Sequence, residues 1–135
     1  MAAGSIRTAI WNKFIADDSA ALTDALDSTR FYYKEADQDI DIPYCIFHIF
    51  NEIYDFTFDL DFEEVLIQFD YYATSASDCD TGITDIKSMF DYAALTITGY
   101  TCLRMERTMV MNSSKDQPDD IWHGIVRYEL LIQKT

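Results

Sequence analysis

Carboxylates are the reactive side chains that this sequence supplies in greatest number, and most of them lie in one stretch. Between Lys34 and Lys87 there are fourteen Asp and Glu residues and no Lys or Arg, so this stretch accounts for the whole formal net charge of −14. Carboxylate pairs such as Asp59 and Glu63 could act as a general acid and base. Because such pairs arise by chance in so acidic a stretch, they give little support for catalysis.

The segment 78–82, Asp-Cys-Asp-Thr-Gly, resembles the start of a calcium-binding loop. In such a loop the glycine would come one position later, and the fifth position would carry a carboxylate. The twelfth position would be Glu, whereas this chain has Met89 there. Acidic residues at the start of a helix explain the same segment through capping and the helix dipole. We therefore expect no calcium site here.

The other candidate ligands and nucleophiles are scattered along the chain. His48 and His123 have no neighbouring Cys, and no His-x-x-x-His arrangement occurs, which argues against zinc. Cys45, Cys79 and Cys102 are widely spaced, and we expect free thiols in a reducing compartment. There is no Gly-rich phosphate loop and no nucleophile elbow. We expect no metal, no cofactor and no catalytic residue, and hence a protein that is not an enzyme.

The acidic stretch also restricts the partners of the protein. It repels the phosphate backbone of nucleic acids, because DNA binding requires Lys and Arg to displace counterions. The simplest interpretation is a solvated acidic face that favours solubility. The tyrosine pairs at 32–33 and 71–72 could stack on bases, but packing within a pleated sheet explains them better where basic neighbours are lacking.

The length and composition predict one folded domain that covers residues 1–135. The chain is 49% hydrophobic and contains nine Phe, nine Tyr and two Trp, which is ample material for one packed core. No run of about 18 apolar residues is present, so we expect no membrane-spanning helix and no membrane partner. The first ten residues do not read as a secretory signal.

The first half of the chain predicts helix followed by strands. Ile6, Ile10 and Phe14 recur at four-residue spacing, which is typical of a helix, and Ser5 can cap it. A short helical piece is expected at 20–26 and an extended segment at 30–35. The run 44–50 reads as a strand that is covered on both faces, and 65–72 as a half-buried strand. Between them, 51–64 reads as a hairpin or strand connection with one charged side. Its acids are Glu52, Asp55, Asp59, Asp61, Glu63 and Glu64.

The second half predicts a helix and then a strand pair. The spacing of apolar residues predicts a helix from about Asp78 to Ala94, capped by Ser77 or Asp78. A strand follows from Tyr100, and it alternates so that Leu103, Met105, Met109 and Met111 lie on one side. The segment 112–120 is expected to be a polar loop, and it is a candidate contact loop or an ordinary hairpin tip. The apolar side of the last strand is formed by Trp122, Gly124, Val126, Tyr128, Leu130 and Ile132.

This order of elements predicts an α+β fold: an antiparallel β-sheet with two main helices packed on one face. The strands carry more apolar surface than two helices can cover. An oligomer or a larger assembly would bury the excess.

The run 122–132, Trp-His-Gly-Ile-Val-Arg-Tyr-Glu-Leu-Leu-Ile, resembles the last strand of the tail-completion, or tail-terminator and head–tail joining, proteins of long-tailed bacteriophages. Four earlier segments resemble parts of the same family in the right order. They are Arg-Phe-Tyr at 30–32, Pro-Tyr at 43–44 with the strand that follows, Gln-Phe-Asp-Tyr-Tyr at 68–72, and 95–111. Trp122, His123, Gly124 and Tyr128 belong to the most telling of these motifs.

The resemblance implies a virion structural protein, a tail terminator whose subunits form a homo-oligomeric, commonly hexameric ring. Such a ring caps the tail tube, contacts the tube protein and a neck or connector protein, and lets DNA pass through its lumen. Its place would be the tail or neck of a virion that is assembled in the host cytoplasm.

Two roles for the acidic stretch are compatible with this resemblance. Carboxylates that line a channel would repel DNA over about 8 Å at physiological salt and so prevent it from adhering. The same acids could instead dock onto a basic surface of the tube or neck. A different neck connector, such as a stopper or adaptor, is the alternative function. A small carboxylate-based enzyme or metal-binding domain is a further one.

Overall fold

The computed structural model describes residues 3–16, 20–35, 41–56, 61–116 and 121–135. Its helices are α1 (Ala3–Ile15), α2 (Ala21–Ala25) and α3 (Ala76–Phe90). Its strands are β1 (Phe31–Tyr33), β2 (Tyr44–Phe56), β3 (Asp61–Ala73), β4 (Tyr100–Asp116) and β5 (Ile121–Lys134). None of the described helices is long and apolar enough to span a membrane.

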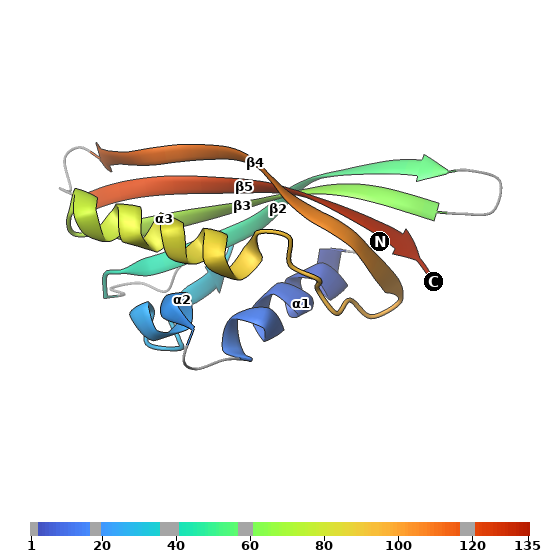
Figure 1. Cartoon of the computed structure of the whole chain (residues 1–135), viewed down its shortest axis with the longest axis horizontal. Helices are drawn as coiled ribbons and strands as arrows, with labels where there is room; N and C mark the ends of the chain where they lie inside the picture. The colour runs from blue at the N-terminus through green and yellow to red at the C-terminus, as the bar shows by residue number, and fades with distance from the viewer. Residues whose placement is uncertain (1–2, 17–19, 36–40, 57–60, 117–120) are drawn as a thin grey trace.

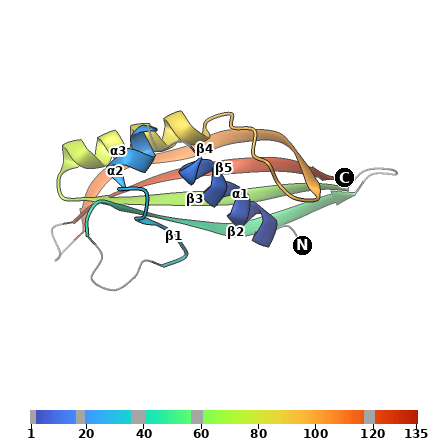
Figure 2. The same cartoon turned by 90° about the horizontal axis from the view of Figure 1, so that it is seen from below.

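The five strands form one sheet in the order β1-β2-β3-β5-β4, and the helices lie on one of its faces (Figures 1 and 2). The predicted α+β fold is therefore confirmed. The sheet is not antiparallel throughout, because the short strand β1 runs parallel to β2. The other three pairings are antiparallel.

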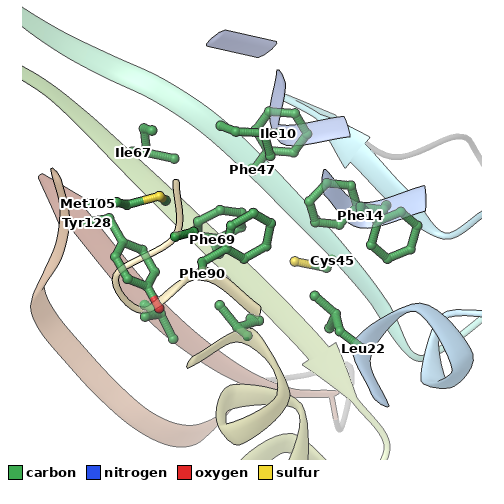
Figure 3. Packing of buried hydrophobic residues seen from close by; sticks show 14 of the residues in the cluster. Ile10, Phe14, Leu22, Cys45, Phe47, Ile67, Phe69, Phe90, Met105 and Tyr128 are labelled. Carbon is green, nitrogen blue, oxygen red and sulfur yellow. The ribbon is translucent and has the colours of Figure 1, made fainter. Parts of the chain in front are cut away.

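The core lies between the sheet and the helices. Successive side chains of a strand point to opposite faces of the sheet, so every second strand residue enters the core. On β3, the side chains of Val65, Ile67, Phe69 and Tyr71 are buried, whereas their alternate neighbours are mostly half-buried on the other face. β5 repeats the pattern from Gly124 to Ile132. Figure 3 shows the ring of Phe69 beside those of Phe90 and Tyr128, with centroids 4.5 and 5.7 Å away.

The two long helices contribute apolar stripes to this core. Ile6, Ile10 and Phe14 of α1 are fully buried, as their spacing predicted. The predicted start of α3 is wrong by two residues, because Ser75 rather than Ser77 or Asp78 is its N-cap. The Ser75 hydroxyl accepts a hydrogen bond from the Asp78 backbone N–H at 3.1 Å, so Asp78 lies in the first turn. There its carboxylate complements the helix dipole.

The close approach of α3 to the sheet requires glycines on both elements. A Cβ at Gly124 of β5 would collide with the Ile83 side chain and lie 3.2 Å from Cys79 Sγ. A Cβ at Gly82 of α3 would overlap the ring of Tyr71. Both positions therefore exclude larger residues for steric reasons.

The described parts of the acidic segment, residues 51–56 and 61–64, are paired strand ends. Strand β2 continues to Phe56 and β3 begins at Asp61, so this segment lengthens both strands beyond their predicted limits. The backbone register pairs Glu52 with Val65, and a bulge interrupts the ladder between Ile49 and Asn51. The paired ends of β2 and β3 extend past the helices along the long axis of the molecule (Figure 1).

Strand β4 does not alternate as predicted. Met105 is buried opposite Leu130, but Leu103 is 44% exposed, and Met109 and Met111 pair with residues whose side chains lie on the other face. The reason is that β-bulges change which face the following residues occupy. The register shifts lie at 102–104, 107–109 and 111–114. The predicted polar loop 112–120 is also shorter than expected, because β4 continues to Asp116.

Candidate assembly surface

In the described parts of the chain, no helix covers the second face of the sheet, which we call the open face (Figures 1 and 2). Its side chains from β2, β3 and β5 alternate with the buried ones and are mostly half-buried. They mix aromatic, aliphatic and charged groups, which is typical of a surface that contacts other proteins. The members that matter below are Tyr44, His48, Glu64, Gln68, Asp70, Tyr72, His123 and Arg127.

A polar network occupies the centre of the open face. Asp70 is only 8% exposed, and its Oδ1 accepts a 2.9 Å hydrogen bond from Gln68 Nε2. His123 Nε2 lies 3.3 Å from the same oxygen, and His48 Nδ1 lies 3.9 Å from Oδ2. Arg127 Nη2 donates to Gln68 Oε1 at 2.7 Å. The network joins β2, β3 and β5, and it gives a carboxylate with little solvent access the polar neighbours that it requires.

Three rings stack across the same strands beside this network. The centroids of Tyr44 and Tyr72 are 4.8 Å apart, and those of Tyr72 and His123 are 4.4 Å apart with nearly parallel planes. The backbone register aligns all three residues across β2, β3 and β5. Ring pairs of this kind add about 0.5–1.5 kcal/mol beyond their burial, so they hold the network in a fixed arrangement.

The two acids of the predicted set whose side chains are described lie on opposite faces. Glu63 is on the core side, 6% exposed, and the Tyr100 hydroxyl donates a long 3.4 Å hydrogen bond to its Oε1. Glu64 lies on the open face, opposite Leu131 of β5. The alternation of β3 separates the pair. Of these two side chains, only that of Glu64 lies outside the core.

Three of the other four acids of that set are placed only through the backbone, and the fourth is not described. Glu52 and Asp55 lie on β2, Asp61 lies at the start of β3, and Asp59 falls outside the described residues. The backbone pairs Asp55 with Phe62, so these acids share the hairpin end with aromatic residues. Whether the set lines a channel or docks onto a partner stays a prediction.

The four residues singled out on the last strand do not form one site. Trp122 packs against the edge of the core, and His123 belongs to the open face. Gly124 lies beneath α3, and Tyr128 is buried. Burial, followed by its hydrogen bond to Asp91, raises the pKa of the Tyr128 hydroxyl, so the group is neutral at physiological pH. These residues serve packing, with the exception of His123.

The described residues offer no arrangement for a metal ion, since no three His, Cys, Asp or Glu side chains among them could hold one. The segment 78–82 lies within α3, so its backbone is helical rather than looped. Burial, followed by the neighbouring Asp80, raises the pKa of the Cys79 thiol to about 11. That shift disfavours the thiolate that a metal would require.

From the sequence alone, His48 was considered only as a zinc ligand and Gln68 and Asp70 only as part of a family-like strand, and the three residues were not connected. The alternation on β3 places Gln68 and Asp70 on the same face, and that signal was available. The partners on β2 and β5 depend on strand register, which the sequence does not specify directly.

No family model matches the chain, and no curated protein matches it in sequence. Among solved structures, its fold is similar to that of a chain from the virion of a native gene transfer agent particle. The TM-score is 0.78 at 12% sequence identity, over 96% of each chain. A second solved structure gives a TM-score of 0.54 at 9% identity, over 98% of this chain and 94% of that one. At these identities the likeness shows a shared fold.

Proposed function

We propose that this protein is a structural subunit of a phage-like virion, and specifically a ring-forming tail terminator that caps the tail tube and joins it to the head. The observation that carries this proposal is the likeness of fold, over almost the whole of both chains, to a chain of a gene transfer agent virion. The family-like strand 122–132, which is β5 of the sheet, supports the same assignment.

The open face supports an assembly role on physical grounds. It presents stacked rings and a carboxylate that is 8% exposed on a face that no described helix covers. Such a surface gains stability when a second subunit or a neighbouring protein covers its apolar side chains. We therefore assign this face to contacts within the virion, with other copies, the tube protein or a neck protein.

Toward DNA and the other virion proteins, two roles of the acidic hairpin end are distinguishable by experiment. If Glu64 and its neighbours line the lumen, the passing DNA is repelled and ring–tube association depends little on salt. If they dock onto a basic surface of the tube or neck, association weakens steeply as salt is added. Measuring ring–tube association at several salt concentrations distinguishes the two roles.

The tail-terminator assignment is tested by the assembly state of the purified protein and by its place in the particle. Size-exclusion chromatography with light scattering, followed by negative-stain imaging, is expected to find closed rings at high protein concentration or on tail tubes. Labelled subunits are expected at the head-proximal end of the tail. A subunit found as a single copy in the particle contradicts the proposal, and labelling elsewhere in the neck favours a stopper or adaptor instead.

A further inference from the structure

A cavity of about 500 Å³ lies between α1 and the neighbouring edge of the sheet, away from the open face. One face of α1 forms its first wall, because the residues involved recur at helical spacing. Strands β1 and β2 form the other. The lining residues are Gly4, Arg7, Thr8, Trp11, Phe31, Tyr32, Tyr33 and Phe47.

The cavity combines an aromatic floor with a cationic rim. Phe31 and Phe47 are 2% and 1% exposed, and their centroids lie 4.9 Å apart. Arg7 Cζ lies 4.7 Å from the ring centroid of Tyr33, and Lys34 Nζ lies 5.4 Å from the same centroid. Both distances are within the range of cation–π contacts, so Tyr33 holds two positive charges at the mouth.

Both cations are available to a partner. Arg7 and Lys34 are exposed, and neither forms an ion pair with a carboxylate among the described residues. A site of this composition selects a ligand that carries carboxylates next to aromatic or aliphatic side chains. The carboxylates meet the rim and the apolar groups meet the floor.

We propose that this cavity is the docking site for the acidic β2–β3 hairpin end, residues 51–64, of a second copy of this chain. The inference rests on the proposed ring and names the contact that builds it. The segment 51–64 carries six acidic residues and no Lys or Arg, and they are interleaved with Tyr54, Phe56, Phe58 and Phe62. Glu63 lies on the core side and is 6% exposed, so it is not among the carboxylates offered to the cavity. This is the combination of charge and aromatic surface that the cavity selects.

The occupant comes from another subunit because the hairpin end of the same subunit is too far away. Phe47, in the floor of the cavity, and Phe56, at the end of β2, lie nine residues apart on one strand. At about 3.3 Å per residue, the separation is about 30 Å. Figures 1 and 2 agree, because α1 lies against the body of the sheet and the paired ends of β2 and β3 extend beyond it.

The contact joins two different patches of the same protein, so it is heterologous. Each subunit offers one hairpin end and one cavity, and a chain of such contacts closes into a ring when the rotation between subunits allows it. In a dimer, every hairpin end and every cavity would be used only if the two copies exchanged hairpin ends with each other at the same time. The proposed geometry thus favours a ring in which every cavity is filled by its neighbour.

The first experiment titrates a synthetic peptide of residues 51–64 into the full-length protein carrying Trp122→Phe, which leaves Trp11 of the cavity as the single tryptophan. The peptide contains no tryptophan, so the emission reports the cavity alone. We expect a saturable change in the emission of Trp11, and we expect the affinity for the peptide to fall about tenfold between 0.1 and 0.5 M salt. A control peptide with its six acids changed to Asn and Gln is expected to bind at least tenfold more weakly. Single-stranded DNA is titrated in the same way as a second anionic probe. Equal binding of both peptides, or a response to the DNA and to neither peptide, overturns the inference.

The second experiment measures assembly by light scattering for Arg7→Gln combined with Lys34→Gln. Lys13→Gln is the matched control, because Lys13 is an exposed cation on α1 that does not line the cavity. The double variant is expected to remain monomeric at concentrations where the parent protein and the control form rings. Rings formed equally well by all three overturn the inference and leave the proposed function intact. Saturable peptide binding by a protein that forms no ring, even on tail tubes, supports the cavity assignment and contradicts the terminator function.

Discussion

The hydroxyl of Tyr128, in the middle of β5, donates a 2.6 Å hydrogen bond to Oδ1 of Asp91, the residue that follows α3. Arg107 of β4 lies 2.8 Å from the other oxygen of the same carboxylate. One carboxylate thus ties the end of α3 to the two strands at one side of the sheet. Because the tyrosine is buried, this contact is shielded from competing water.

Substitution Tyr128→Phe removes that hydrogen bond and leaves the ring in place. We expect the free energy of unfolding to fall by about 1.5–3 kcal/mol, since the acceptor is charged. Urea denaturation followed by circular dichroism measures the change. Tyr92→Phe is the control, because Tyr92 is 84% exposed, and it is expected to have little effect. Equal stability of the two variants contradicts the assigned role of the hydrogen bond.

Substitution Gly124→Ala forces a Cβ into the Ile83 side chain and is expected to lower the free energy of unfolding by about 1–3 kcal/mol. Gly4→Ala is the matched control, because Gly4 lies in α1 and a Cβ there meets no atom within 4 Å. That control is expected to be neutral or stabilising, since Ala is the better helix former. Thermal and urea unfolding of both variants provide the comparison, and a tolerated Gly124→Ala argues against the close packing of α3.

Substitution Asp85→Asn is expected to stabilise the protein at neutral pH. Burial raises the pKa of the Asp85 carboxyl above its ordinary value. The folded state therefore binds a proton more readily than the unfolded state, and stability is lost as pH rises through the folded pKa. We expect a small gain at pH 7, at most about 0.5 kcal/mol because solvent screens this partly exposed carboxylate, and the gain disappears below about pH 4.

The control for that substitution is Asp41→Asn, an exposed position outside the helices and strands. Urea midpoints at pH 3.5 and pH 7 for the parent and both variants measure the effect. An Asp85→Asn variant that is less stable than the parent at pH 7 contradicts the prediction.

The protein is expected to lose stability in mildly alkaline solution. Burial is the main cause that raises the pKa of the Cys79 thiol to about 11, and burial likewise raises the pKa values of Cys45 and Tyr71. An unfolded thiol titrates near pH 8.5, so the unfolded state gives up its proton first and stability falls from about pH 8.5 upward. Urea midpoints at pH 8 and pH 10.5 measure this loss. A Cys79→Ala variant is expected to show a shallower decline, and a parent midpoint that does not move refutes the prediction.

The three thiols are expected to differ in their reactivity toward a thiol reagent at pH 8. Cys45 and Cys79 are buried, whereas Cys102 is half-buried on β4. We expect at most one thiol to react within minutes in the folded protein and all three to react in urea. Cys102→Ser identifies the reactive group, because this variant is expected to react only after unfolding. Rapid reaction of Cys45 in the folded state contradicts its placement in the core.

The periodicity of apolar residues was sufficient to predict which sides of α1, β3 and β5 are buried. The four-residue spacing of Ile6, Ile10 and Phe14 identified the buried stripe of α1, and alternation identified the buried side of β3 and β5. The same method failed on β4, because a bulge shifts the face without changing the composition of the strand. It also placed the start of α3 two residues late, since several Ser and Asp residues there could each serve as a cap.

The candidate surfaces were less accessible to prediction, because they depend on contacts between distant segments. The acidic character of 51–64 was evident, but the division of Glu63 and Glu64 between the two faces follows from strand parity. The approach of His48 and His123 to Asp70 depends on the register of three strands. The cavity beside Tyr33 arises from the packing of α1 on the sheet, which no periodicity encodes.

The three register shifts along β4 have a consequence for the exposed border of the sheet, because β4 is its outermost strand on one side. A straight outer strand of 17 residues would offer an unbroken template for identical chains to add to, one after another, as in fibrils. Kinks at three points break that template into short pieces. The bulges of β4 thus oppose the edge-to-edge addition of further copies at this border of the sheet.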